Sequence, residues 1–257
     1  MLKVEDLRFR YSSRGPLVLD GVNLQLQPGQ IGIVLGRNGS GKSTLFKTIL
    51  GIQKPLSGKV LFEGQDLHAM PRRERARIAA YVPQDIRFGD LTVFDSVLLG
   101  RIAYFGMRAG ADDIAAVEQI LQEMDLSDFA ARSVEQLSGG ERQKIAIARA
   151  MAQDPRLMVF DEPTGNLDMA NELLILQEAK RLAREKNIAI LCSLHDLNQA
   201  LQLGDRFFFM KQGRVKYACD AQDITEELIR DVYGVAVKII QAENRKIIIG
   251  GDLNENK

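Results

Sequence analysis

The stretch Gly36-Arg37-Asn38-Gly39-Ser40-Gly41-Lys42-Ser43 determines how the rest of this chain is interpreted. A glycine, four residues, a second glycine, a lysine and a serine at this spacing form a loop whose backbone N–H groups cradle nucleotide phosphates. The pattern is meaningful when a strand precedes it and a helix follows it. Residues 30–35 have the composition of a short buried strand, and residues 42–50 carry apolar side chains at helical spacing before Gly51. The stretch therefore predicts a phosphate-binding loop for ATP or GTP.

The residue types in the loop explain the predicted chemistry. Glycines allow a tight turn that brings N–H groups close to a phosphate, and the helix that starts at Lys42 adds about half a positive charge. Lys42 supplies a full charge to the β- and γ-phosphates, and the Ser43 hydroxyl is placed to bind Mg²⁺. The alternative, a glycine-rich turn with an exposed lysine, does not explain the flanking strand and helix.

Length, charge and cysteine content narrow the class of protein. The 257 residues fit one large domain, or a domain with an inserted subdomain. Basic and acidic residues balance at 34 each, so we expect a small soluble ligand or a protein partner and no nucleic acid. No apolar run approaches the roughly 18 residues of a membrane-spanning helix, and residues 1–6 are too charged for a secretion signal. Cys192 and Cys219 lack metal-type spacing and are expected to be core thiols of a cytoplasmic protein.

Hydrophobic periodicity predicts the arrangement of the elements. Residues 3–11 and 21–26 alternate like half-exposed strands, which predicts an antiparallel layer beside the phosphate loop. From about residue 89 the pattern turns helical and predicts an inserted helical subdomain. Strand and helix patterns then alternate from residue 157 to beyond residue 195, and a short helix and two apolar runs follow residue 223. We predict an α/β fold with a parallel sheet flanked by helices, with ligands at the carboxyl ends of its strands.

Acidic and imidazole side chains follow two of the predicted buried strands. Asp161 and Glu162 come directly after the apolar residues 157–160, and His195 follows the apolar run 188–194. Asp161 is placed on the magnesium side, Glu162 to polarise an attacking water as a general base, and His195 to contact a γ-phosphate. An acidic turn before Pro163 and a structural histidine are the alternatives.

Residues 137–143, Leu-Ser-Gly-Gly-Glu-Arg-Gln, form the second distinctive stretch. Ser138 with Glu141 three residues later predicts a capping box at the start of a helix over residues 142–152, a role that needs no ligand. Capping does not explain the adjacent Gly139 and Gly140, which would let a phosphate approach the N–H groups of a helix start.

The chain resembles the ATP-binding cassette of ABC transporters in the order of four features. These are the phosphate loop, residues 137–143, the apolar run ending in Asp161-Glu162, and His195. The resemblance covers about residues 1–240, with the helical subdomain at about 89–155 inserted in a RecA-like P-loop NTPase core, and it leaves 241–257 as a C-terminal tail. It implies that two copies meet head to tail. Each nucleotide then lies between the phosphate loop of one copy and the glycine-rich stretch of the other.

The resemblance also implies a role for individual residues, with ATP and Mg²⁺ as cofactors. Phosphate and magnesium contacts fall to Gly36, Arg37, Asn38, Gly39, Ser40, Gly41, Lys42, Ser43 and Thr44. The implied catalytic residues are Lys42, Glu162 as the base, His195 as the γ-phosphate sensor, and Gln84. The implied magnesium-binding residues are Ser43, Gln84 and Asp161. Tyr11 stacks on adenine, Asp168 lies in the loop that crosses the dimer, and Ser138, Gly139 and Gly140 contact the neighbour's ATP. Without the resemblance, a loop role for Gln84 and a core role for Tyr11 stay open.

Several segments resemble one subfamily, the importers of iron–siderophore complexes, heme and cobalamin: residues 75–84, 97–101, 195–200 and 232–235. Residues 162–168 differ and are more similar to lipoprotein-release and cell-division cassettes. We expect an ATPase subunit of a bacterial importer at the cytoplasmic side of the membrane. Its partners would be a second copy, two transmembrane permease subunits and an external substrate-binding protein.

The surface that contacts the permease is predicted near Gln84, with Phe88, Leu91, Val93 and Phe94 as candidates; packing inside the helical subdomain is their alternative. Two other classes of protein remain possible from the sequence. A soluble cassette ATPase of DNA repair or translation is disfavoured by the single phosphate loop and the lack of a heptad run. A nucleotide-gated scaffold without turnover is disfavoured by the presence of both Glu162 and His195.

Overall fold

The computed structural model describes residues 1–165, 167–242 and 245–250. Asn166, in the loop that the resemblance assigns to the dimer, and part of the predicted tail 241–257 lie outside the described residues. Within the described ranges, no helix is both long enough and apolar enough to cross a membrane.

Strands and helices alternate along most of the described chain. The strands are β1 (Leu2–Phe9), β2 (Leu19–Leu26), β3 (Ile31–Leu35), β4 (Ser57–Phe62), β5 (Gln65–Asp66), β6 (Ala79–Val82), β7 (Leu157–Asp161), β8 (Ala189–Ser193), β9 (Arg206–Lys211), β10 (Arg214–Cys219), β11 (Val237–Ala242) and β12 (Arg245–Gly250). The α-helices are α1 (Lys42–Ile49), α2 (Arg72–Ile78), α3 (Val93–Leu98), α4 (Ala111–Glu123), α5 (Gly139–Met151), α6 (Met169–Glu185), α7 (Leu197–Leu203) and α8 (Glu226–Tyr233).

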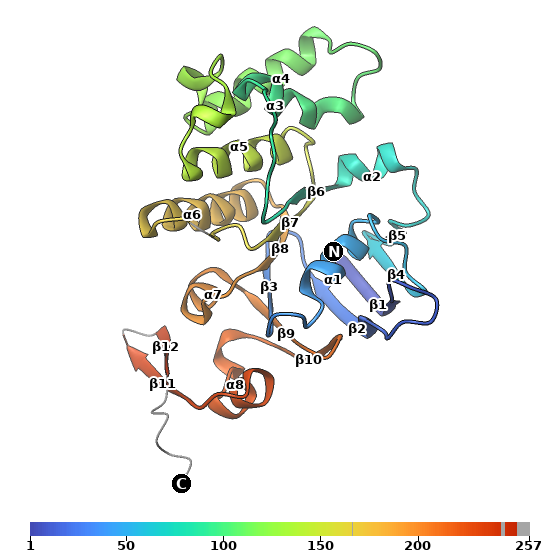
Figure 1. The fold of residues 1–257 in the computed structure, drawn as a ribbon, viewed down its shortest axis with the longest axis vertical. Coiled ribbons are helices and arrows are strands. Elements are labelled where there is room, and N and C mark those ends of the chain that lie inside the picture. The colour runs from blue at the N-terminus through green and yellow to red at the C-terminus, as the bar shows by residue number, and fades with distance from the viewer. Residues whose placement is uncertain (166, 243–244, 251–257) are drawn as a thin grey trace.

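The central sheet has the strand order β10-β9-β3-β8-β7-β6, in which all neighbours are parallel except β10 with β9. Strands β3, β7 and β8 are buried along their whole length, as expected for parallel strands covered on both faces. Figure 1 shows α5, α6 and α7 on one side of these strands, and α1 with β1, β2 and β4 on the other. The predicted α/β fold with a helix-flanked parallel sheet and an antiparallel sheet is confirmed.

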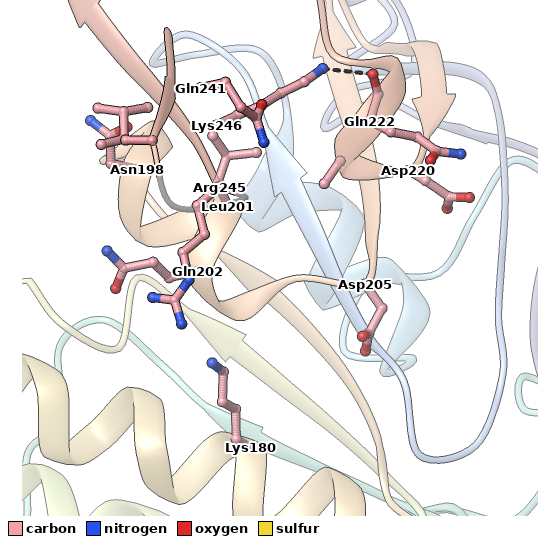
Figure 2. Close-up of a pocket in the computed structure, with 13 residues that line it drawn as sticks. Lys180, Asn198, Leu201, Gln202, Asp205, Asp220, Gln222, Gln241, Arg245 and Lys246 are labelled. Atoms are coloured by element: carbon pink, nitrogen blue, oxygen red, sulfur yellow. Dashed lines mark hydrogen bonds between the residues drawn. The ribbon is translucent and has the colours of Figure 1, made fainter. Parts of the chain in front are cut away.

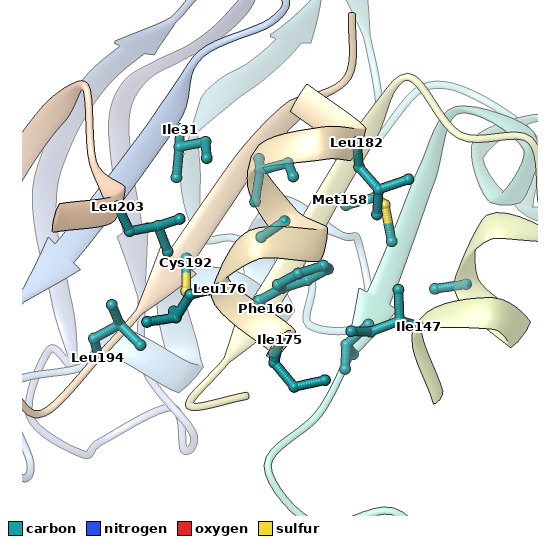
Figure 3. Packing of buried hydrophobic residues seen from close by; sticks show 14 of the residues in the cluster. Ile31, Ile147, Met158, Phe160, Ile175, Leu176, Leu182, Cys192, Leu194 and Leu203 are labelled. Atoms are coloured by element: carbon teal, nitrogen blue, oxygen red, sulfur yellow. The ribbon is translucent and has the colours of Figure 1, made fainter. Parts of the chain in front are cut away.

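The alternation of side chains along each strand divides the core into two clusters. Met158 and Phe160 of β7 face α5 and α6, where Ile175 and Leu182 pack against them (Figure 3). Leu157 and Val159 face the opposite side and join the cluster that contains Phe46 of α1 and the antiparallel sheet β2-β1-β4-β5. The phosphate-loop helix is therefore held between two sheets.

The helices α3, α4 and α5 lie between β6 and β7 in the sequence and occupy one end of the molecule (Figure 1). An ion pair between Arg101 and Asp113, 3.1 Å from Nε to Oδ1, joins the turn after α3 to α4. Phe88 and Val93 are buried, 8% and 0% exposed, because they belong to the same core cluster. The expectation that these two side chains form a docking surface is therefore wrong, and their alternative, internal packing, holds.

The C-terminal elements pack beside the central sheet. Helix α8 is anchored through Asp231, whose carboxylate accepts hydrogen bonds from Lys211, Lys216 and Tyr217; these contacts lower the pKa of Asp231 to about 2. The hairpin β11–β12 is fastened to α7 by Asn198, whose side chain bonds both the N–H and the C=O of Ile248. The segment after β10 thus contacts the helix that follows His195.

Candidate nucleotide-binding site

A cavity of 480 Å³ opens where β3, β8 and β7 end side by side. It brings together residues that are far apart in the sequence. Its walls are formed by Tyr11, Val18, Asn38, Gly39, Gly41, Lys42, Ser43, Thr44, Gln84, Glu162 and His195. Ten of these eleven residues, all but Val18, are site residues that the sequence analysis predicts.

The phosphate loop between β3 and α1 requires glycine at defined positions. Gly36 has φ +153°, and a Cβ there would lie 2.4 Å from the carbonyl oxygen of Met210. Gly41 has φ +104°, and a Cβ there would lie 3.0 Å from the carbonyl oxygen of Val18. Since L-residues rarely adopt such φ values, the loop conformation explains these two glycines without any ligand.

Lys42 is drawn back against the loop. It is only 6% exposed, and its ammonium donates a hydrogen bond of 2.8 Å to the carbonyl oxygen of Gly36. Burial lowers the pKa of Lys42, while the nearby carboxylates of Glu162 and Asp161 act in the opposite direction. A partly desolvated cation over open N–H groups is suited to an anionic ligand.

The start of α1 lacks a side-chain cap, in contrast to several other helices. Its N-cap residue is Gly41, which has no side chain to accept from the first N–H groups. Helices α5, α6, α7 and α8 are capped by the side chains of Ser138, Asp168, Asp196 and Thr225. The uncapped N–H groups of α1 therefore face the cavity with their hydrogen bonds still to be made.

Asp161 ends β7 behind the cavity and is 3% exposed. Its carboxylate accepts hydrogen bonds from Ser193 Oγ at 2.9 Å and from the Tyr81 hydroxyl at 3.1 Å. Burial, followed by the charge of Asp161, raises the pKa of Tyr81, so Tyr81 stays a donor. Ser193 and Tyr81 come from the neighbouring strands β8 and β6 and hold Asp161 in one position.

Glu162 and His195 meet at the edge of the cavity. Glu162 Oε2 lies 2.7 Å from His195 Nε2, and the Glu162 side chain is 11% exposed whereas that of His195 is 55% exposed. Glu162 has φ +53°, an uncommon value for a residue with a side chain, and its N–H donates to Ser193 Oγ at 3.0 Å. Ser193 thus connects the Asp161 carboxylate to the backbone of Glu162.

Tyr11 forms the outer wall of the cavity rather than part of the core. Its side chain is 64% exposed, so the alternative of a core role is wrong. The ring packs edge-on against Phe9 at 5.0 Å between centroids, and its hydroxyl lies 2.9 Å from Thr44 Oγ1. An exposed aromatic face held in place over the loop is available for stacking.

Four of the remaining candidates lie outside this cavity. Ser138 and Asp168 are exposed N-caps of α5 and α6, and the predicted capping box is present: Ser138 Oγ accepts from Glu141 N–H, and Glu141 Oε2 accepts from Ser138 N–H at 2.7 Å. Gly139 is exposed and Gly140 is buried. Within one copy these residues do not join the phosphate loop.

A smaller cavity of 380 Å³ adjoins the loop and shares Asn38 and His195 with the first. Gly36, Arg37 and Tyr233 also line it. Burial raises the pKa of Tyr233 to about 12, with an opposing contact from the Gly36 backbone. Ser40, the remaining loop residue, is 7% exposed and packs under Gly36.

A larger cavity of 1120 Å³ lies elsewhere, between the hairpin β11–β12, α6 and α7 (Figure 2). Among its described lining residues, both carboxylates are already paired: Asp205 with Arg184 and Asp220 with Arg206. None of its described lining residues belongs to the phosphate loop or to the residue pair Asp161-Glu162.

The family model described as ABC transporter matches residues 19–165. That range contains the phosphate loop, residues 137–143 and the pair Asp161-Glu162. The chain belongs to the ABC transporter family. It is an ABC ATPase, the transporter subunit that binds and hydrolyses ATP.

Curated ABC proteins match over nearly the whole chain. The sequence is 36% identical over 249 residues to an uncharacterized ABC transporter ATP-binding protein of Methanocaldococcus jannaschii, covering 97% of each. It is 35% identical over 243 residues to the phosphonates import ATP-binding protein PhnC of Bradyrhizobium diazoefficiens, covering 91% of this chain and 90% of that protein.

Solved ABC structures share the fold. A chain of an inward-facing transporter described as of the metal-chelate type has a TM-score of 0.84 at 29% identity, covering 99% of this chain and 98% of that chain. A dimeric ATP-binding cassette in a post-hydrolysis state, bound to ADP and Pi, has a TM-score of 0.75 at 28% identity, covering 86% of this chain and 98% of that chain.

Proposed function

We propose that this ABC ATPase powers an import complex and that each ATP binds between two copies of the chain. One observation carries the proposal. The cavity joins Lys42, Glu162 and His195, whereas Ser138 and Gly139 lie exposed outside it. A nucleotide site that needs the cavity residues together with Ser138 and Gly139 is completed only by a second copy of the chain. The dimeric cassette structure bound to ADP and Pi supports this arrangement.

Within one copy the proposed roles follow from position and charge. Lys42 and the open N–H groups of α1 hold the β- and γ-phosphates, and Tyr11 stacks on the adenine. Glu162 accepts a proton from the attacking water, and His195, which contacts Glu162 directly, senses the γ-phosphate.

The donor set suits a magnesium ion bound together with the nucleotide. Ser43 and Gln84 line the cavity with a hydroxyl and an amide oxygen, and the buried Asp161 lies behind them. No cluster of three His, Cys, Asp or Glu side chains suited to a metal occurs among residues 1–165, 167–242 and 245–250. Mg²⁺ often uses few protein ligands and takes the rest from phosphates and water, where it neutralises phosphate charge.

The trans contact requires a local rearrangement at Ser138. Its Oγ donates a hydrogen bond of 2.7 Å to Glu141 Oε2, and the Ser138 hydroxyl and then its backbone N–H lower the pKa of Glu141. The hydroxyl hydrogen must leave Glu141 before it can reach a phosphate of the other copy. Arrival of ATP in a closed dimer supplies that competing acceptor.

Residues 1–240 form the proposed cassette domain, with the helical subdomain at about 89–155 as the part that contacts the permease pair. Around the turn that follows α3, three large apolar side chains are exposed: Leu99 by 45%, Ile102 by 63% and Met107 fully. Together with the exposed Gln84 they are the proposed contact with the transmembrane subunits. An external substrate-binding protein would complete the importer on the far side of the membrane.

Import of a metal-chelate cargo, of the iron–siderophore, heme or cobalamin type, is the proposed transport reaction. Segments 75–84, 97–101, 195–200 and 232–235 support the subfamily, and the fold neighbour described as a metal-chelate type transporter supports the cargo class. The relatives named as phosphonates import ATP-binding proteins support import as the direction of transport, although their names give a different cargo. Export, suggested by residues 162–168, is the alternative.

ATPase activity of the purified chain, with paired lysine variants, tests the catalytic part of the proposal. We expect Lys42→Ala to lower kcat/KM by about 10²–10³-fold, the usual effect of removing one charge-stabilising group. Lys47→Ala, in the last turn of the same helix and outside the cavity, should change it less than about twofold. Equal rates for both variants would contradict the proposed site.

Glu162→Gln separates turnover from mere binding. The variant keeps the shape of the side chain but cannot accept a proton, so we expect ATP to bind while hydrolysis falls by about 10²–10⁴-fold. Equal and negligible rates for wild type and Glu162→Gln would favour a non-hydrolysing scaffold. Co-purification of tagged chain with its membrane partner, followed by uptake assays in vesicles, tests import against export.

A further inference from the structure

The first turn of α5 lies against the first turn of α6 within the same copy. A Cβ added to Gly140 would lie 2.2 Å from Oδ1, 2.3 Å from Cγ and 2.9 Å from Nδ2 of Asn171. The side-chain amide of Asn171 therefore lies directly on the Gly140 backbone. Any side chain at position 140 would have to displace it.

Asn171 is also bonded to the N-cap of its own helix. Its Nδ2 donates to Asp168 Oδ2 at 3.1 Å, and its backbone N–H donates to Asp168 Oδ1 at 2.9 Å. Both oxygens of the Asp168 carboxylate are thus held by one residue. The amide of Asn171 cannot rotate away from Gly140 without giving up the bond to Oδ2.

The neighbouring glycine shows that this contact is specific to position 140. A Cβ on Gly139 would meet only Leu167 Cδ2, at an ordinary 3.6 Å, and Gly139 is exposed. Gly140 therefore has a reason within its own copy to lack a side chain, whereas steric packing does not require glycine at position 139. The two adjacent glycines serve different purposes.

We propose that Asn171 is a positioning residue that keeps the start of α5 (residues 138–140) and Asp168 in one fixed arrangement. The inference rests on the proposed function, in which the start of α5 is presented to the nucleotide site of the other copy, and on the role that the resemblance implies for Asp168 in the loop that crosses the dimer. A shift of α5 at Gly140 moves the Asn171 amide, and the amide moves the Asp168 carboxylate. The two trans-acting groups then engage and disengage together.

This arrangement predicts that Gly140→Ala acts through Asn171. The new methyl group pushes the amide off Asp168 and leaves α6 with an altered cap. When Asn171 is already alanine, the three atoms nearest to the new methyl group, Oδ1, Cγ and Nδ2 of Asn171, are gone. The second substitution should then rescue the first instead of adding to it.

A double-mutant cycle tests the inference, using Gly140→Ala, Asn171→Ala and the double variant. ATP-dependent dimerisation is measured by light scattering in the Glu162→Gln background, and kcat is measured in the background with Glu162 intact. We expect each single variant to weaken dimerisation and to lower kcat. In the double variant the combined loss should be smaller than the product of the two single losses by at least about fivefold, within the usual range for contacting residues. Binding of a fluorescent ADP to the isolated monomer should change less than about twofold, because its site is built from other residues.

Asn23→Ala is the matched control, because the side chain of Asn23 also makes two hydrogen bonds but lies in the antiparallel sheet. Thermal unfolding of each variant accompanies the cycle. Simple multiplication of the two single effects, or an Asn171→Ala variant that behaves like Asn23→Ala, would overturn the inference while the composite site stands. Failure of the parent Glu162→Gln chain to dimerise with ATP would overturn the proposed function as well.

Discussion

Ser193 is buried at the point where two parts of the site meet, and Ser193→Ala is the sharpest perturbation that the structure offers. The side chain is 0% exposed. Its hydroxyl donates to Asp161 Oδ1 at 2.9 Å and accepts from the Glu162 N–H at 3.0 Å. Alanine removes both bonds while leaving the fold of β8 unchanged.

The expected magnitude follows from the two bonds. A hydrogen bond to a charged group contributes about 1.5–3 kcal/mol and a neutral one about 0.5–1.5 kcal/mol to stability. We expect Ser193→Ala to lower the free energy of unfolding by about 2–4 kcal/mol, since the carboxylate and the N–H stay buried with fewer partners. Because Glu162 loses the anchor of its unusual backbone conformation, kcat should also fall by about 10- to 100-fold.

Urea unfolding and steady-state ATPase kinetics measure these two effects. Ser96→Ala is the matched control, because Ser96 is equally buried and its hydroxyl has no hydrogen-bond partner within the described residues. That substitution removes the same atom without breaking a bond and should be neutral or stabilising. An unfolding free energy for Ser193→Ala within about 0.5 kcal/mol of that for Ser96→Ala, with kcat unchanged, would refute the reasoning.

Three further substitutions or modifications test other parts of the structure. Tyr11→Ala should raise the KM for ATP by about 5- to 100-fold through lost stacking, whereas Tyr11→Phe should keep most of the affinity; equal KM values for the two variants would argue against stacking. When the native protein is treated with a thiol reagent, the half-buried Cys219 should react. The fully buried Cys192, whose pKa is raised by burial, should react only after unfolding. Simultaneous reaction of both cysteines would show that β8 is open in the native protein. Asp113→Asn should lower the free energy of unfolding by about 3–5 kcal/mol, because it leaves the charge of the largely buried Arg101 unpaired. An unchanged unfolding free energy in calorimetry would show that the ion pair does not stabilise the fold.

Features set by local sequence were predictable. The glycine spacing of residues 36–43 fixes the loop by backbone conformation alone, and the capping box of Ser138 with Glu141 is a contact three residues apart. Strands β3, β7 and β8 of the central sheet were predictable because buried parallel strands are continuous apolar runs. In each case the signal and its structural cause lie within the same short stretch.

Contacts between distant elements were not predictable from one sequence. Ser193 and Tyr81 reach Asp161 from neighbouring strands, across 32 and 80 residues of sequence, and neither carries a local pattern. The strand order β8-β7-β6 creates these contacts. Ser193 stands at the carboxyl end of a predicted strand, and that position is the signal that could have marked it. Tyr81 lies in β6, a strand that the sequence analysis does not predict.

Two other features could not be predicted from one sequence for the same reason. They are the burial of Phe88 and Val93 and the steric requirement for glycine at position 140. Both depend on which helix packs where in the segment between β6 and α6. An apolar side chain in a helical segment can face a core or a partner, and periodicity alone does not distinguish the two.

The central claim is that one nucleotide is held by two copies, and cysteine cross-linking tests it most directly. Asn38→Cys and Ser138→Cys are combined in a Glu162→Gln, Cys219→Ser chain, and both new cysteines replace exposed residues. With a short bifunctional maleimide we predict a covalent dimer in Mg²⁺–ATP that is absent in Mg²⁺–ADP and absent when only Ser138→Cys is present. A dimer that forms equally with ATP and ADP, or no dimer at all, would contradict the account.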